Sequence, residues 1–287
     1  MYMHDGEFIK FKRDGKDVAV LIQWDEYPES PREWDNLGTM VCFHNRYRLG
    51  DKHNYEYPHN FIADLLRKTM GTNDLLHKIL AGMPNLEIAH DGNEFVLLEH
   101  YHNIRGEEDI CSVANGETKE ALMRDLQYRL ESLEINTLRS LIDPDKLAIL
   151  PLYLLDHSGL WMSTSSFYDP WDSGQVGWIY ITKAGFLRES GYAKSNWPQR
   201  AYEILEGEVK IYNQYLTGEV CGFQEFELDE DGDWIETENS CCGFYGCDIE
   251  ENGVVDYVSG LAEAIKSGEY ETGTAKEHRV TTVFYEF

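Results

Sequence analysis

Apolar residues recur at two different spacings along this chain, and each spacing predicts a different kind of element. Residues 7–23 alternate apolar and polar side chains around an Arg-Asp-Gly-Lys turn, a pattern that predicts a β-hairpin. Four other segments place apolar residues three and four positions apart, which predicts amphipathic helices. These segments are residues 61–70, 73–83, 118–133 and 196–216.

Shorter β-rich segments occupy much of the remaining chain. We expect a short helix near 254–266 and strands at residues 39–44, 94–102, 146–159, 175–182 and 279–287. Residues 220–228 and 233–240 predict a second hairpin. The sequence therefore predicts an α+β fold, an antiparallel sheet with packed helices and an acidic C-terminal hairpin. The segment Leu-Ile-Asp-Pro-Asp-Lys at 141–146 predicts a boundary between two α+β regions, residues 1–145 and 146–287.

Composition restricts the class of protein further. The 287 residues include 52 acidic and 25 basic side chains, a net charge of −27, and 42% are hydrophobic. A chain with this hydrophobic content can bury a core, so we do not expect a disordered acidic tail. The charge argues against direct binding to nucleic acid or to an anionic membrane. The longest apolar run, Leu147–Leu155, is too short to span a bilayer, and the first residues do not read as a secretory signal.

The negative charge is concentrated toward the end of the sequence. Residues 203–287 hold 21 acidic and four basic side chains, a net charge of −17, whereas the first 202 residues carry −10. Nine carboxylates and no lysine or arginine lie between Glu219 and Glu238. This stretch is therefore the first place to look for a function that depends on charge.

Strand geometry predicts how the acidic hairpin presents these side chains. If residues 229–232 form its loop, Phe226 pairs with Ile235 and Glu225 with Glu236, and the carboxylates share the face opposite the core. We expect this exposed face to bind a basic partner. The candidate partner-binding residues are Glu225, Glu227, Asp229, Glu230, Asp231, Asp233, Glu236 and Glu238.

Two other interpretations of the same residues stay open. The acidic face can be a solvated surface that only keeps the protein in solution. Residues 227–238 also resemble a calcium-binding loop in their spacing of acidic side chains, although Glu227 stands where aspartate is expected and the flanks alternate like strands. An ordinary Asp-Gly turn explains the same residues.

Several residue types that can carry catalysis or bind metal occur without a diagnostic spacing. Asp156, His157 and Ser158 are adjacent, but a triad requires contacts that spacing does not show. His100 and His102 lie on one face of a predicted strand, where they could bind a metal. Cys241, Cys242 and Cys247 could hold zinc together with a fourth ligand. The more common interpretation is paired histidines and reduced thiols. We therefore predict no catalytic residue, no metal and no cofactor.

Three segments together resemble a known family. They are residues 29–53 (ESPREWDNLGTMVCFHNRYRLGDKH), residues 152–181 with the run PWDSGQVGWIY, and residues 209–223 with 240–246. They are similar to a widespread family of uncharacterised proteins that phages, prophages and mobile elements encode. The resemblance implies a phage accessory protein that acts in the cytoplasm of its host, and it implies no catalytic residues.

The charge and the resemblance together predict a counter-defence protein. We expect a non-enzymatic inhibitor that binds a basic host defence protein, such as a restriction or CRISPR-type nuclease complex, by imitating the charge of nucleic acid. Such a protein would be an antirestriction or anti-CRISPR factor. One alternative is an enzyme acting on a nucleotide or nucleic-acid-linked substrate, with residues 156–177 and His100 and His102 lining its pocket. Another is a component of the virion or of its assembly.

Overall fold

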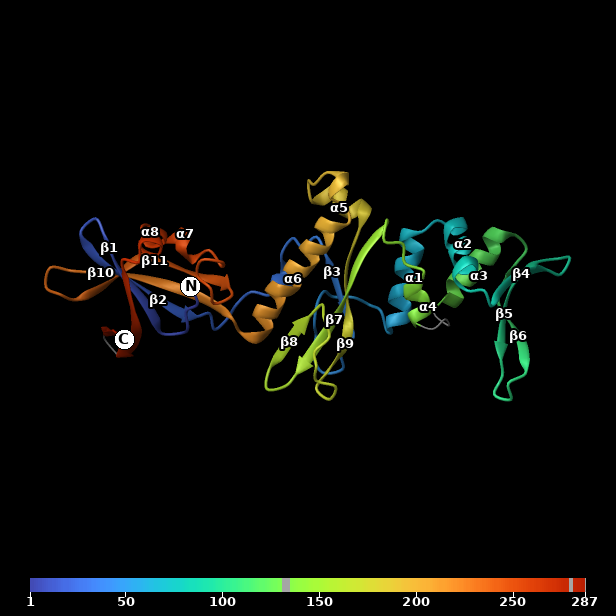
Figure 1. The fold of residues 1–287 in the computed structure, drawn as a ribbon, viewed down its shortest axis with the longest axis horizontal. Coiled ribbons are helices and arrows are strands. Elements are labelled where there is room, and N and C mark those ends of the chain that lie inside the picture. Colours follow the sequence, from blue (N-terminus) through green and yellow to red (C-terminus); the bar gives the residue numbers. More distant parts are fainter. Residues whose placement is uncertain (131–134, 279–280, 287) are drawn as a thin grey trace. The chain divides into compact units, whose positions relative to one another are not determined.

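The structure is a computed structural model that describes residues 1–130, 135–278 and 281–286. The chain forms two compact units, each assembled from segments that are distant in sequence (Figure 1). The first unit contains residues 1–36, 153–174 and 207–287, and the second contains residues 37–152 and 175–206. The sequence-based division instead had one boundary, after residue 145.

An antiparallel sheet of six strands is the framework of the first unit. Its strand order is β11-β10-β2-β1-β12-β13, so the acidic strand β11 lies at one edge. The strands are β1 (Glu7–Arg13), β2 (Lys16–Trp24), β10 (Val220–Leu228), β11 (Trp234–Tyr245), β12 (Tyr270–His278) and β13 (Thr281–Glu286). The two predicted hairpins are therefore neighbours, because β10 pairs with β2 along most of its length.

Alternating apolar residues give this sheet a buried layer on each face. Ile9, Val20 and Phe223 pack with residues of the short helices α7 (Val254–Tyr257) and α8 (Leu261–Ser267). Figure 1 shows these two helices side by side along the strands. Residues at the intervening strand positions, Phe8, Ala19, Leu21 and Phe226, form a smaller buried cluster on the other face.

Four helices and a small sheet form much of the second unit. The helices are α1 (Pro58–Thr69), α2 (Thr72–Gly82), α3 (Lys119–Arg129) and α4 (Ile135–Ser140), and the strands are β4 (Leu86–His90), β5 (Phe95–His102) and β6 (Glu108–Gly116). Helices α2 and α3 lie against that sheet. Phe61, Leu75, Leu97 and Leu122 are fully buried where these elements meet. The periodic apolar residues noted in the sequence thus form the core of this unit.

Another antiparallel sheet has the strand order β3-β9-β7-β8. Its strands are β3 (Thr39–Cys42), β7 (Leu147–Asp156), β8 (Leu160–Ser163) and β9 (Ser173–Thr182). Helix α5 (Lys183–Glu189) follows β9, and the 19-residue helix α6 (Gln199–Thr217) leads to β10. Gly177 allows β3 and β9 to approach closely, since a Cβ atom there would lie 2.0 Å from the Val41 carbonyl oxygen.

The predicted α+β class with antiparallel sheets and packed helices is confirmed, and the acidic segment does form a hairpin. Strands β4, β6, β8 and β12 and helices α4 and α5 are elements that the sequence did not predict. Parts of two predicted elements lie outside the described residues, namely residues 131–133 of the helix predicted at 118–133, and residues 279, 280 and 287 of the predicted last strand. None of the helices within the described ranges is both long and apolar enough to cross a membrane.

Candidate acidic interface

The turn of the β10–β11 hairpin is one residue longer than the sequence predicted. Leu228 pairs with Trp234, so five residues, 229–233, lie between the strands. The Asp229 carboxylate closes this loop, because its Oδ1 accepts hydrogen bonds from the backbone N–H groups of Asp231 (2.9 Å) and Asp233 (2.8 Å). Gly232 takes the positive φ of 87° that the turn requires. Asp229 therefore has a structural role in the loop.

A bulge changes the pairing of the acidic residues. Gln224 pairs with Ser240 and Phe226 with Glu236, so residues 237–239 of β11 lie opposite Glu225 alone. The predicted pairs of Glu225 with Glu236 and of Phe226 with Ile235 are wrong. The longer loop shifts the register by one residue, and the bulge removes Glu225 from the ladder with β11.

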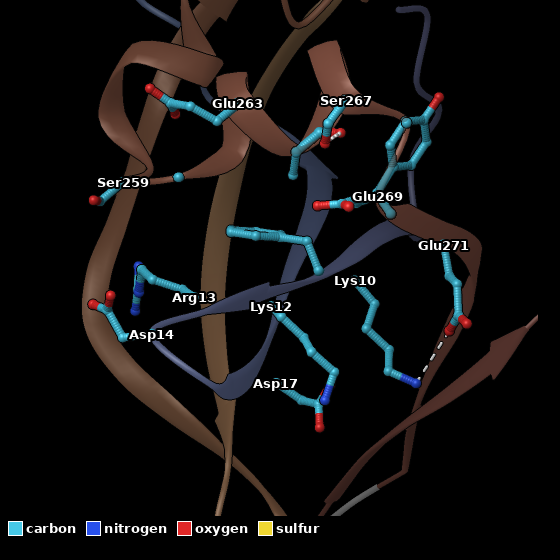
Figure 2. Close-up of a pocket in the computed structure, with 15 residues that line it drawn as sticks. Lys10, Lys12, Arg13, Asp14, Asp17, Ser259, Glu263, Ser267, Glu269 and Glu271 are labelled. Carbon is cyan, nitrogen blue, oxygen red and sulfur yellow. Dashed lines mark hydrogen bonds and ion pairs between the residues drawn. The ribbon is translucent and has the colours of Figure 1, made fainter.

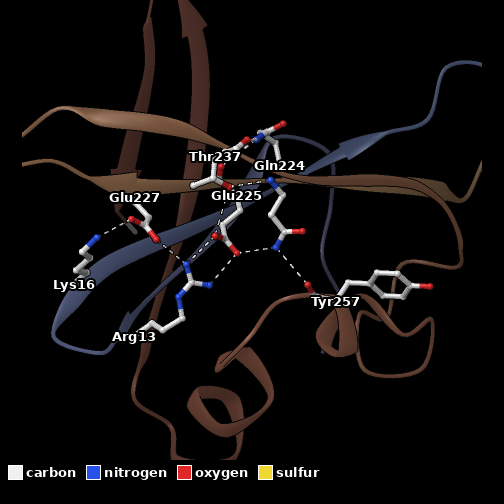
Figure 3. Close-up of polar contacts among 8 residues, drawn as sticks. Arg13, Lys16, Gln224, Glu225, Glu227, Thr237 and Tyr257 are labelled. Carbon is white, nitrogen blue, oxygen red and sulfur yellow. Dashed lines mark hydrogen bonds and ion pairs between the residues drawn. The ribbon is translucent and has the colours of Figure 1, made fainter.

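The sequence predicted that Glu225 lies on an exposed acidic face. In the structure its side chain is buried, with only 4% exposed. Its carboxylate oxygens accept hydrogen bonds from both terminal nitrogens of Arg13, at 3.1 and 2.8 Å, and from the side-chain nitrogen of Asn239, at 2.9 Å (Figure 3). The same Asn239 nitrogen reaches the carbonyl oxygen of Tyr257 at 3.3 Å. This network connects the hairpin to β1 and to helix α7.

The pKa of Glu225 results from opposing effects. Burial raises it, and the hydrogen bonds from Arg13 and Asn239 lower it by a larger total, so the pKa lies below its ordinary value. The neighbouring Glu227 is one-third exposed and is also paired, with Lys16 at 3.2 Å and with Arg13 at 2.8 Å. Lys16 and Arg13 hold the pKa of Glu227 below its ordinary value too. Arg13 and Lys16 of the first hairpin therefore neutralise the charges of Glu225 and Glu227, two of the predicted partner-binding residues.

The other carboxylates of the hairpin are exposed. Besides Asp229, they lie in the loop and on the adjoining part of the edge strand β11, and they are Glu230, Asp231, Asp233, Glu236 and Glu238. Within the part of the chain that the structure describes, none of these five side chains forms an ion pair. They are the hairpin acids that remain available to a partner, and we call them the tip acids.

A groove of about 1100 Å³ lies beside the first hairpin, between β1, α8 and the start of β12 (Figure 2). The basic residues that line it already have acidic neighbours. Lys10 pairs with Glu271 at 3.2 Å, Lys12 lies 3.5 Å from Asp17, and Arg13 is held by the acidic hairpin. The groove therefore carries mixed charge, and its basic side chains do not form a site for a phosphate group.

The residues considered for catalysis or metal binding do not form one site. His157 and Asp172 form a pair in the first unit, with Nδ1 and Oδ2 2.7 Å apart, but both side chains are exposed. This hydrogen bond raises the pKa of His157. His100 belongs to the second unit, where it pairs with Glu87 at 3.2 Å. No group of three or more histidine, cysteine or acidic residues among the described positions is arranged to hold a metal ion.

The thiols of the predicted zinc alternative are separated by their burial. Cys241 and Cys242 are exposed on β11, whereas Cys247 is buried, and all three are free. Burial raises the pKa of the Cys247 thiol, so that thiol is held in the protonated form that binds metal poorly. The enzyme alternative stays a prediction.

Sequence reasoning missed the residues that anchor the acidic hairpin. Arg13 is 212 positions from Glu225, and no local pattern relates them. The only sequence signal is that a basic hairpin tip, residues 10–16, accompanies an acidic one in the same chain. Comparison with models of protein families, with curated proteins and with solved structures found no match. The resemblance to phage-encoded proteins therefore stays a prediction from the quoted segments.

Proposed function

We propose that this chain is a non-enzymatic inhibitor that a phage produces in the host cytoplasm, and that its tip acids bind a basic surface of a host anti-phage defence protein. The observation that carries the proposal is the unequal treatment of charge within one hairpin. Glu225 and Glu227 are paired with Arg13 and Lys16, whereas the five tip acids within residues 230–238 are exposed and form no ion pair among the described residues.

The spacing of two tip acids suits a surface that binds a polyanion. Glu236 and Glu238 are alternate residues of strand β11, and such residues are about 6.7 Å apart along an extended strand, roughly twice the rise along the DNA axis between successive phosphates of one strand. A groove that attracts phosphates attracts any anion of suitable spacing, because its field does not depend on the chemical identity of the charge. A restriction or CRISPR-type nuclease provides such a groove, and the hairpin would compete with its nucleic acid there.

The position of the hairpin in the sheet supports the same function. The tip acids lie at the end of the edge strand β11, so a partner can reach them without displacing another strand. Acidic residues on an edge strand also prevent unwanted pairing with other strands. Protection of the edge and solubility require only that charge be present. Binding to a basic partner requires the tip acids themselves, so that replacing them should affect binding more than an equal change of charge elsewhere on the chain.

The test replaces the five tip acids by lysine and leaves the loop-closing Asp229 and the paired Glu225 unchanged. The replacement alters the net charge from −27 to −17. A control variant makes the same charge change at exposed acids outside the hairpin. These are Glu108, Glu117, Glu120, Asp145 and Glu263.

Bacteria that carry one restriction or CRISPR-type system each would produce the natural chain or one of the variants before infection by a phage that the system restricts. We expect plating to recover with the natural chain and with the control variant, and to stay restricted with the tip variant. Recovery that is equal for both variants would show that bulk charge is sufficient. If the natural chain protected the phage against none of the systems in a panel of this kind, the proposed function would be rejected.

A further inference from the structure

Outside the two hairpins, the loop between β8 and β9 carries the most exposed aromatic side chains among those that the structure describes in the first unit. Tyr168 is fully exposed and Trp171 is 90% exposed, although large aromatic side chains normally bury most of their surface. Trp161, on the adjoining strand β8, is 42% exposed. Neither the fold nor the hairpin interface explains why these rings face the solvent.

Hydrogen bonds hold the backbone of this loop in one conformation. The Asp169 Oδ1 atom accepts the backbone N–H groups of Trp171 at 2.8 Å and of Asp172 at 3.0 Å. The Asp172 carbonyl oxygen accepts the N–H of Asp156 at 2.8 Å, and its carboxylate accepts a hydrogen bond from His157. The Ser173 hydroxyl also donates to the carbonyl oxygen of Asp169. Trp171 is therefore carried by an ordered turn, which begins directly after Tyr168, and this order lowers the entropic cost of using the Trp171 ring for binding.

The charge around the loop selects the kind of partner. Residues 147–182 contain no lysine or arginine and three acidic residues, Asp156, Asp169 and Asp172. The Asp169 and Asp172 carboxylates accept hydrogen bonds within the loop, and the latter is paired with His157, whereas Asp156 contributes its backbone N–H. Backbone N–H groups of Asp172 and Trp171 hold the pKa of Asp169 below its ordinary value, so that this carboxylate is charged at neutral pH. A second copy of this chain, at −27, would be repelled.

We propose that the β8–β9 loop is a docking site for an arginine side chain of a basic partner protein, with Trp171 and Tyr168 as the stacking surfaces and Asp169 and Asp172 as the neighbouring carboxylates. A guanidinium group is planar and stacks on an aromatic face while its N–H groups bind carboxylate oxygens. The ammonium group of lysine has the same charge, but it is a more strongly hydrated point charge and stacks less well. The site therefore distinguishes arginine from lysine, which the tip acids do not.

Two peptides of equal charge, acetylated and amidated hexa-arginine and hexa-lysine, are suitable probes. Their affinities for the natural chain and for Trp171→Ala, Trp171→Phe and Tyr168→Ala would be measured by calorimetry at low salt. We expect the natural chain to prefer hexa-arginine by roughly two- to fivefold, the range that one exposed cation–π contact gives. Trp171→Ala removes this preference without weakening hexa-lysine binding, and Trp171→Phe retains part of it.

Control variants separate this site from the hairpin. Tyr27 is 89% exposed in another loop, so Tyr27→Ala should leave the preference unchanged. Replacement of the tip acids by lysine should weaken both peptides equally and preserve their ratio, so failure of the hairpin proposal would not affect this result. Equal affinities of the natural chain for the two peptides, binding of neither, or a preference that survives Trp171→Ala would each overturn the proposal.

Discussion

Replacement of Arg13 by methionine tests the network that fixes the acidic hairpin on the first unit. The substitution keeps a long apolar side chain but leaves the Glu225 carboxylate, only 4% exposed, without its guanidinium partner. Removing one member of a buried ion pair typically costs about 3–5 kcal/mol. Arg13 is itself 21% exposed, and Asn239 still donates to the carboxylate at 2.9 Å. We therefore expect the lower end, about 3 kcal/mol, which is a factor of about 150 in the unfolding equilibrium.

Amide hydrogen exchange along β10 is the appropriate assay, because it reports the stability of the first unit separately from that of the second. In a double variant, Arg13→Met with Glu225→Met, no buried charge is left unpaired. Its loss should be about 1 kcal/mol or less. Lys12→Met is the matched control, since Lys12 is 72% exposed and its contact with Asp17 is 3.5 Å long. We expect it to change stability by less than about 1 kcal/mol.

A loss below about 1 kcal/mol in Arg13→Met would contradict the burial argument. So would a double variant that is as unstable as the single one, because the cost would then come from lost packing and not from the unpaired carboxylate.

Three further outcomes follow from individual contacts. The folded-state pKa of Glu225 lies below its unfolded value of 4.5, so the contribution of Glu225 to stability should be complete above pH 4.5 and be lost as the pH falls through the folded-state pKa. Hydrogen exchange of β10 at several pH values should show this loss of stability, and Glu225→Gln should reduce its dependence on pH. Asp172→Asn should lower the pKa of His157 toward 6.5 in an NMR titration, and an unchanged pKa would refute the role of that carboxylate. Gly177→Ala should destabilise the second unit by about 1–3 kcal/mol, because its Cβ would overlap the Val41 carbonyl; exchange of β3 amides at the natural rate would contradict this.

Local sequence predicts the first hairpin more accurately than the second. Asp14 and Gly15 adopt positive φ values, and Arg13 pairs with Lys16, as a two-residue Asp-Gly turn requires. The second turn also contains Asp-Gly, but the Asp229 side chain closes a loop of five residues. These side-chain hydrogen bonds add to the backbone hydrogen bonds of the loop and leave no signal in the hydrophobic pattern, so the register could not be predicted.

Features whose stability depends on pairing with another strand were also missed. Strand β6 is mostly exposed, and its sequence, EDICSVANG, lacks the alternation that identifies a half-buried strand. It exists because it pairs with β5 along almost its whole length. The burial of Glu225 has the same origin, since Arg13 and Asn239 reach it from other strands. Sequence patterns predict which residues are apolar, but not which charged residue finds a partner inside the fold.

The most direct test of the central claim is the salt dependence of binding between this protein and a nuclease against which it protects. Screening by salt weakens contacts between exposed charges much more than buried ones. The natural chain and the control variant should lose affinity steeply as salt increases. The variant with lysine at the tip acids should bind weakly at low salt and show a nearly flat slope. Equal affinities and equal slopes for all three proteins would contradict the claim that the tip acids form the interface.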